Sequence, residues 1–168
     1  PLTDLPTRVA FDDQIAEAAR RADHQKGSLA LLHIGLDGFK SINENFDHRT
    51  GDRMLREMAA RLRALARPGD CVARLGGDEF LVLLGADADE ESAGRLAKAV
   101  LESIRRPCKL DGREDGVTCS IGIAMYPENG EDQQTLVRNG KLAVRAARGT
   151  AERVVAYDPV HGRSEEHT

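Results

Sequence analysis

The stretch Ala73-Arg74-Leu75-Gly76-Gly77-Asp78-Glu79-Phe80 predicts a β-hairpin that carries two acids at its tip. Apolar runs lie on both sides of a Gly-Gly pair, which is typical of two strands joined by a tight turn. Glycine lets the backbone turn sharply and approach a ligand without a Cβ in the way. Neighbouring strand residues face opposite ways, so one acid can point into a site while the other supports it. An ordinary turn with two solvated acids fits these residues equally well.

Outward from this hairpin, the apolar pattern predicts a mixed α/β (α+β) domain. We expect strands over residues 29–36, 70–75, 79–84, 108–110, 117–125 and 154–157. We expect helices over residues 9–23, 39–46, 89–105 and 132–148, with a further long helix that opens at residues 50–52 and is ended by Pro68-Gly69. The natural packing is a ferredoxin-like palm, a central mixed and mostly antiparallel sheet flanked by helices.

The composition fits one soluble domain. A length of 168 residues is enough to bury a core, and the net charge of −4 argues against a DNA or RNA partner. No apolar run approaches the roughly 18 residues that span a bilayer. Three cysteines without a CxxC pair predict reduced thiols in the cytoplasm. We expect a domain over residues 1–157 and a polar tail or linker over residues 158–168, which leads toward a further domain of a longer protein.

A second group of polar residues, Asp37-Gly38-Phe39-Lys40, follows the buried strand directly. A loop between a strand end and a helix start can present backbone N–H groups to phosphate. Lys40 would add a point charge for the same group. A surface loop with a solvated lysine is the alternative.

A third group is Asn43 with Asp52. An asparagine can pair with a purine edge as donor and acceptor, and a carboxylate can accept from N1–H and N2–H of guanine. This pair therefore suits guanine better than adenine. Alternatively, Thr50 caps the helix and Asp52 merely lies in its first turn.

Together these segments resemble the GGDEF family, the diguanylate cyclases, over nearly the whole chain. The hairpin, the second group and the third group all match family motifs at the family spacing. The remaining matches are Leu2-Thr3-Asp4-Leu5-Pro6-Thr7-Arg8, His48-Arg49-Thr50-Gly51-Asp52, Ser120-Ile121-Gly122-Ile123-Ala124 and Tyr126-Pro127. The signature with its spaced flanking motifs is a specific signal.

The resemblance implies the palm fold of nucleotide cyclases and a reaction on GTP. Two GTP molecules, one on each domain of an antiparallel homodimer, would condense into cyclic di-GMP with release of pyrophosphate, assisted by Mg²⁺ or Mn²⁺. The implied roles are guanine binding by Asn43 and Asp52, phosphate binding by Gly38, Phe39, Lys40 and Arg148, metal binding by Asp78, and catalysis by Asp78 and Glu79.

The segment Arg67-Pro68-Gly69-Asp70 has the position of the family's inhibitory RxxD site. By that resemblance, Arg67 and Asp70 would bind the product, cyclic di-GMP. The alternative is an arginine at a helix C-terminus followed by a turn aspartate.

The departures from the family pattern that bear most on catalysis are at two positions. Gly35 stands where the family has a metal-binding aspartate, so a hard dication should bind weakly unless Asp37 compensates. Glu152 replaces a phosphate-binding arginine, and Arg153 compensates only from one residue out of register. Each loss typically removes several kcal/mol of transition-state stabilisation.

We therefore expect a weak or inactive cyclase that binds GTP, cyclic di-GMP or both and regulates an attached domain, for which a cyclic di-GMP phosphodiesterase is the first candidate. The chain would then lie in the cytoplasm, or form the cytoplasmic part of a membrane-bound protein. Two alternatives stay open. One is an active diguanylate cyclase, favoured by the intact residues 76–80, and the other is a dimerising module without a ligand.

Overall fold

The computed structural model describes residues 5–39, 48–85, 87–110 and 113–159, which contain four helices of the chain. The helices are α1 (Arg8–Gln25), α3 (His48–Leu65), α4 (Glu90–Arg105) and α5 (Gln133–Arg148). The strands are β1 (Leu29–Asp37), β2 (Cys71–Gly76), β3 (Glu79–Leu84), β4 (Cys108–Leu110), β5 (Arg113–Asp115), β6 (Thr118–Tyr126) and β7 (Val154–Ala156).

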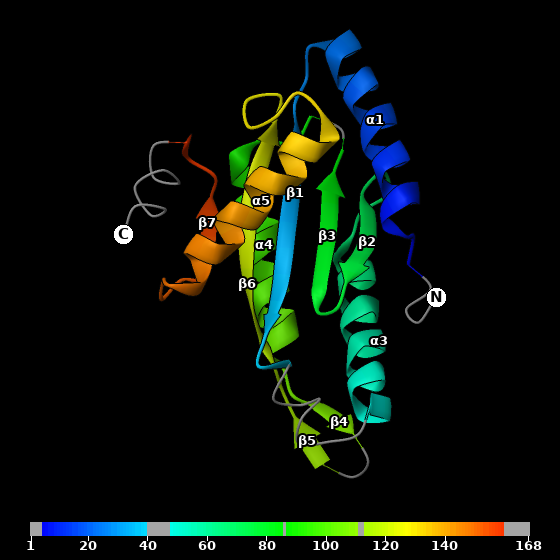
Figure 1. The fold of residues 1–168 in the computed structure, drawn as a ribbon, viewed down its shortest axis with the longest axis vertical. Helices are drawn as coiled ribbons and strands as arrows, with labels where there is room; N and C mark the ends of the chain where they lie inside the picture. Colours follow the sequence, from blue (N-terminus) through cyan, green and yellow to red (C-terminus); the bar gives the residue numbers. More distant parts are fainter. Residues whose placement is uncertain (1–4, 40–47, 86, 111–112, 160–168) are drawn as a thin grey trace.

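Five strands form one sheet in the order β2-β3-β1-β6-β7, and β1 lies at its centre (Figure 1). The pairs β2–β3, β1–β3 and β1–β6 are antiparallel, and β6–β7 is parallel. The predicted mixed, mostly antiparallel sheet with flanking helices is confirmed. The short hairpin β4–β5 is separate, and its second strand was not predicted because residues 113–115 are all charged.

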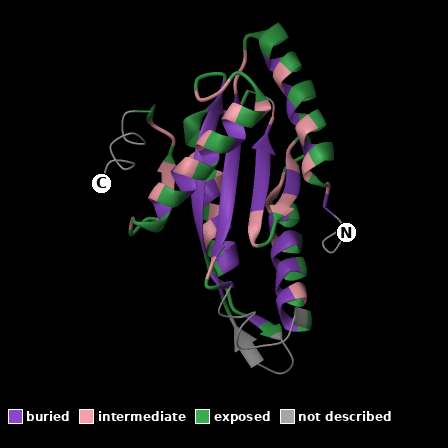
Figure 2. Ribbon diagram, viewed as in Figure 1, coloured by how far each residue is buried: buried purple, intermediate pink, exposed green. Residues whose placement is uncertain are grey.

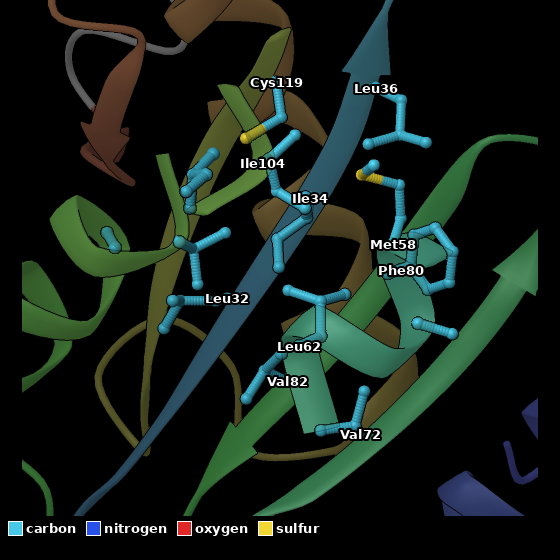
Figure 3. Close-up of a cluster of buried hydrophobic side chains, with 14 of the residues drawn as sticks. Leu32, Ile34, Leu36, Met58, Leu62, Val72, Phe80, Val82, Ile104 and Cys119 are labelled. Atoms are coloured by element: carbon cyan, nitrogen blue, oxygen red, sulfur yellow. The ribbon is translucent and has the colours of Figure 1, made fainter. Parts of the chain in front are cut away.

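Both faces of the sheet are covered, which explains the continuous apolar run of β1. Its first eight residues are all buried, and the central strands are buried along their lengths in Figure 2. Helices α3 and α4 pack on one face, where Ile34, Met58 and Phe80 belong to the larger core (Figure 3). Helices α1 and α5 pack on the opposite face, around Phe11 and Leu136.

Side-chain caps begin three of the helices. Thr7 caps α1, Asp89 caps α4 with a hydrogen bond of 2.7 Å from Ser92 N, and Asp132 caps α5 with one of 2.8 Å from Thr135 N. These backbone hydrogen bonds lower the pKa of Asp89 and of Asp132. Helix α3 begins at His48, slightly before the predicted residues 50–52, and ends at Leu65. The helix predicted over residues 39–46 lies almost wholly outside the described residues.

No helix in the described part of the chain is both long and apolar enough to cross a bilayer. None of the three cysteines forms a disulfide among the described residues: Cys108 and Cys119 are buried, and Cys71 is half-buried. Burial raises the pKa of Cys119 to about 12, so this thiol stays protonated at neutral pH.

Helix α5 lies close to the sheet because glycines leave no side chains between them at this point. A Cβ at Gly122 of β6 would lie 2.4 Å from the carbonyl oxygen of Gly140 and 2.5 Å from the backbone nitrogen of Val144. Both contacts are with helix backbone, which cannot move as a side chain can. The position of α5 over β1 and β6 therefore depends on Gly122.

We predict that Gly122→Ala destabilises the fold by about 2–3 kcal/mol, the upper part of the usual range for overpacking a dense core. Gly94→Ala is the control, since Gly94 lies in α4 with nothing within 4 Å of its Cβ position. That variant should gain about 0.5–1 kcal/mol from helix propensity. Urea unfolding followed by circular dichroism measures both, and shifts of the same sign in the two variants would contradict this account.

Candidate active site

The candidate site lies at the end of β1, on the face of the sheet that α5 covers. Gly35 is opposite Glu79 of β3 on one side and opposite Ser120 of β6 on the other. Residues directly opposite each other in an antiparallel pair share a face. Asp37 follows two residues later on β1 and so shares this face too. The register thus brings residues from three strands together.

The turn between β2 and β3 is held against the end of β1 (Figure 1). Gly76 and Gly77 have positive φ angles of 139° and 53°, which L side chains rarely adopt. Arg74 donates from Nε and Nη2 to the carbonyl oxygen of Gly77, at 3.2 and 2.9 Å. Leu36 N donates to the carbonyl oxygen of Asp78 at 3.0 Å. These bonds fix Asp78 and Glu79 beside the site, as the predicted hairpin requires.

Glu79 is mostly buried, with 21% of its side chain exposed, and it lies above a buried histidine. Nε2 of His33 is 3.5 Å from Oε1 of Glu79, and neither imidazole nitrogen has a hydrogen-bond partner among the described residues. The imidazole is the largest cause that lowers the pKa of Glu79. Partial burial opposes it, and the charges of Lys141 and Arg148 assist it.

Sequence reasoning missed His33. The only signal is a single polar residue inside the apolar run of residues 29–36, and a histidine in a buried strand is ordinary. Its place beneath Glu79 follows from the pairing of β1 with β3, which local sequence does not specify.

The carboxylate of Asp37 is surrounded by hydrogen-bond donors. Its Oδ2 accepts from Nη1 of Arg153 at 2.6 Å and from Oγ of Ser120 at 2.9 Å. Nε of Arg148 lies 3.4 Å from the other oxygen, Oδ1. Arg153 reaches Asp37 from a left-handed backbone conformation, with a φ of 59°. Arg153 therefore supplies a cation at this site, although it is one residue away from the family position, while Glu152 lies exposed.

Arg148 also fills the space above Gly35. A Cβ at Gly35 would lie 2.6 Å from Nη2 of Arg148 and 3.4 Å from Cγ1 of Val144. Four residues of helix rise about 6 Å, and two residues of strand rise about 6.6–6.8 Å. Residues 140, 144 and 148 of α5 therefore lie over residues 33, 35 and 37 of β1 in turn. The guanidinium of Arg148 also reaches back over residue 35, into the space that a side chain there would occupy.

The residues present do not fit a divalent ion at this point. No group of three or more His, Cys, Asp or Glu side chains suited to a metal occurs in the described ranges. Asp37 is already neutralised by two guanidinium groups, and residue 35 offers no side-chain oxygen. Two unit charges about 4 Å apart interact by about 4 kcal/mol near a protein surface. Screening by solvent lowers the repulsion between these arginines and a metal ion, whereas the double charge of the ion raises this repulsion.

The predicted product-site residues Arg67 and Asp70 lie side by side at the end of the segment that follows α3. Asp70 has only 4% of its side chain exposed, and its carboxylate accepts from Arg67 N at 3.0 Å and from Gly85 N at 3.3 Å. Asp70 therefore ties this turn to the end of β3. The side chain of Arg67 is largely exposed, with Nε 3.6 Å from Asp70 Oδ2, and it is free to turn toward a ligand.

The other predicted residues are only partly placed. Gly38 is exposed with a φ of 81°, and the side chain of Phe39 belongs to the larger core, so only its backbone can face a ligand. Asp52 is half-buried in the first turns of α3. Lys40 and Asn43 lie outside the described residues.

Comparison with known proteins identifies the family to which this sheet and hairpin belong. The sequence profile of the GGDEF family, described as "Diguanylate cyclase, GGDEF domain", matches residues 1–153. The chain belongs to this family. It is 39% identical over 163 residues to the diguanylate cyclase TpbB of Pseudomonas aeruginosa, a match that covers 94% of the chain and 38% of TpbB.

Further relatives and solved structures also contain or consist of GGDEF domains or act in cyclic di-GMP metabolism by their names. The bifunctional diguanylate cyclase/cyclic di-GMP phosphodiesterase MucR of the same organism is 38% identical, over 88% of the chain and 21% of MucR. The GGDEF domain of TpbB superposes with a TM-score of 0.93 at 35% identity, covering 99% of the chain and 98% of that structure. The GGDEF domain of DgcB from Caulobacter crescentus, solved with c-di-GMP, has a TM-score of 0.84 at 26% identity, with 94% of each chain covered. The chain thus spans well under half the length of TpbB and of MucR.

We predict a pH-dependent contribution of Glu79 to stability. A lowered pKa in the folded state stabilises the protein above the usual glutamate pKa of about 4.3, and that stabilisation is lost as the pH falls through the lowered value. Glu79→Gln should therefore be less stable than the native protein at neutral pH, and the difference should shrink in acid.

Urea unfolding at several pH values measures this difference. Glu102→Gln is the control because Glu102 is an exposed glutamate of α4 that lies outside the first turn of the helix. A Glu79→Gln difference that stays constant from neutral to acid pH would contradict the role given to His33.

Proposed function

We propose that this domain binds guanine nucleotides of the cyclic di-GMP system, has weak or no diguanylate cyclase activity, and regulates a domain attached to it. The observation that carries the proposal is the state of Asp37. Its carboxylate is held by Arg148, Arg153 and Ser120, while residue 35 has no side chain. A cyclase of this family would need that corner for the ion that activates GTP, and this chain fills it with arginine.

Other parts of the site support continued ligand binding. The hairpin is fully formed, and Glu79 keeps a lowered pKa and hence its negative charge. Asp52 on α3 is half-buried and suits guanine. Arg67 is exposed beside Asp70, in the arrangement expected of a site for cyclic di-GMP. The solved complex of the DgcB domain with c-di-GMP supports the same ligand here.

A regulatory role is supported by the relatives. The chain corresponds to 21% of MucR, whose name includes a cyclic di-GMP phosphodiesterase. We propose an attached phosphodiesterase domain as the first candidate for the regulated partner, with Mg²⁺ or Mn²⁺ binding weakened and a homodimer as the assembly. The cytoplasm, where GTP is available, is the compartment that this role requires.

Active diguanylate cyclase is the second candidate, favoured by the intact residues 76–80 and by Glu79 at the sheet end. The reaction would join two GTP into cyclic di-GMP and release two pyrophosphates. Chromatography after incubation with GTP and Mg²⁺ or Mn²⁺ separates the candidates. We expect no product beyond traces, and steady turnover at moderate protein concentration would favour the cyclase.

We predict that the chain binds cyclic di-GMP and that Arg67→Ala weakens this binding by about tenfold or more, the usual effect of losing a hydrogen bond to a charged group. Arg67 is the cleaner probe, because Asp70→Ala would also free the backbone nitrogens of Arg67 and Gly85. Arg95→Ala, which removes an exposed arginine on α4, is the matched control. Isothermal titration calorimetry measures each affinity. Equal affinity of the two variants would remove Arg67 from the product site, and absence of binding to both GTP and cyclic di-GMP would refute the proposed function.

A further inference from the structure

The cations at the end of β1 outnumber the acids that face them. Lys141, Arg148 and Arg153 carry three positive charges, and Asp37 and Glu79 carry two negative ones. Lys141 and Arg148 both act on Glu79, and Arg148 and Arg153 both contact Asp37. These five side chains, which we call the arginine-filled corner, carry one positive charge in excess, not counting the carboxylate of Asp78 in the adjoining turn, and so attract an anion more than a further cation.

The arginine-filled corner keeps donors for a ligand. A guanidinium has five N–H donors in a rigid fork. Arg153 uses Nη1 on Asp37, and Arg148 directs Nε toward the same carboxylate at 3.4 Å. Their side chains are 41% and 44% exposed, so the remaining N–H groups can be reached from solvent. Asp37 thus holds the guanidinium groups of Arg148 and Arg153 in position. This lowers the side-chain entropy that the two arginines lose when a phosphate binds.

The space beside Gly35 is occupied by a positively charged group. Gly35 offers no carboxylate, and Nη2 of Arg148 takes the volume that the side chain would fill, 2.6 Å from its Cβ position. We infer that the guanidinium groups of Arg148 and Arg153 bind the phosphates of a guanine nucleotide directly, in place of a divalent ion, so that this domain binds GTP without Mg²⁺.

This inference rests on the proposed function, because it concerns how the same nucleotide is held. The inference predicts a different dependence of GTP binding on metal from that of a domain that has only lost its metal site. A domain that had merely lost its metal site would bind GTP weakly under all conditions, whereas the arginine-filled corner should bind it equally well with the metal chelated. It also assigns Arg153 a role in binding, although it lies one residue from the family position.

The test is isothermal titration with guanosine 5′-[α,β-methylene]triphosphate, which cannot be cleaved between the α and β phosphates. Titrations in EDTA and in excess MgCl₂ should give dissociation constants within about threefold of each other. In EDTA, Arg148→Ala should raise the dissociation constant by about tenfold or more. Arg145→Ala is the matched control, since Arg145 is an exposed arginine in the same last turn of α5, and should leave the constant unchanged.

A metal titration gives a readout that needs no nucleotide. The native protein should not bind Mn²⁺, as followed by the electron paramagnetic resonance signal of the free ion. The double variant Gly35→Asp, Arg148→Ala removes the guanidinium and supplies a carboxylate beside Asp37, so it should bind Mn²⁺ and bind the nucleotide more tightly with Mg²⁺ than with EDTA. Circular dichroism melting checks that each variant is folded, because residue 35 lies in the central strand.

The outcomes separate the two proposals. Nucleotide binding that requires Mg²⁺ overturns this inference and leaves the proposed function standing, and so does Mn²⁺ binding by the native protein. An unchanged affinity of Arg148→Ala in EDTA also overturns it, as does a folded double variant that does not bind Mn²⁺. No binding of the analogue in either buffer overturns this inference, and the proposed function then stands only if the cyclic di-GMP titration shows binding.

Discussion

The pairing of β1 with a strand on each side is the constraint on which the rest of the structure depends. This strand sets the height of the hairpin tip on one side and of β6 on the other, because Gly35 lies between Glu79 and Ser120. A slip by one residue would turn every one of these side chains to the opposite face. The two cores hold the register, since alternate residues of β1 are buried in each of them.

The packing of helix α5 on the sheet decides which charged side chains lie beside the end of β1. Its close approach at Gly122 places three successive turns of the helix over three successive positions of β1 on one face. The first turn covers His33, the second covers Gly35, and the last brings Arg148 to Asp37. Backbone packing therefore decides which side chains meet in the arginine-filled corner. The charges there depend on which residues of α5 lie over which residues of β1.

The fold could be predicted from sequence because its signals are local. A Gly-Gly turn between apolar runs, acids at helix starts and a strand-length apolar run at residues 29–36 all reflect short-range chemistry. Strand β5 was missed because its three charged residues carry no apolar pattern. Within the site, the absence of a carboxylate at Gly35 was visible in the sequence. Its replacement by Arg148, the reach of Arg153 to Asp37 and the burial of His33 under Glu79 were not, since each contact joins segments far apart in the chain.

The arginine over Gly35 also bears on how such a domain can evolve. An aspartate at residue 35 would take the space of the Arg148 guanidinium, which is the end of a flexible side chain and would have to move, and loss of Arg148 would leave Asp37 with one cation fewer. The effect of a change at residue 35 should therefore depend on which residue stands at position 148. Such a coupled pair has to be changed together, so positions 35 and 148 are constrained as one unit although they are far apart in the chain.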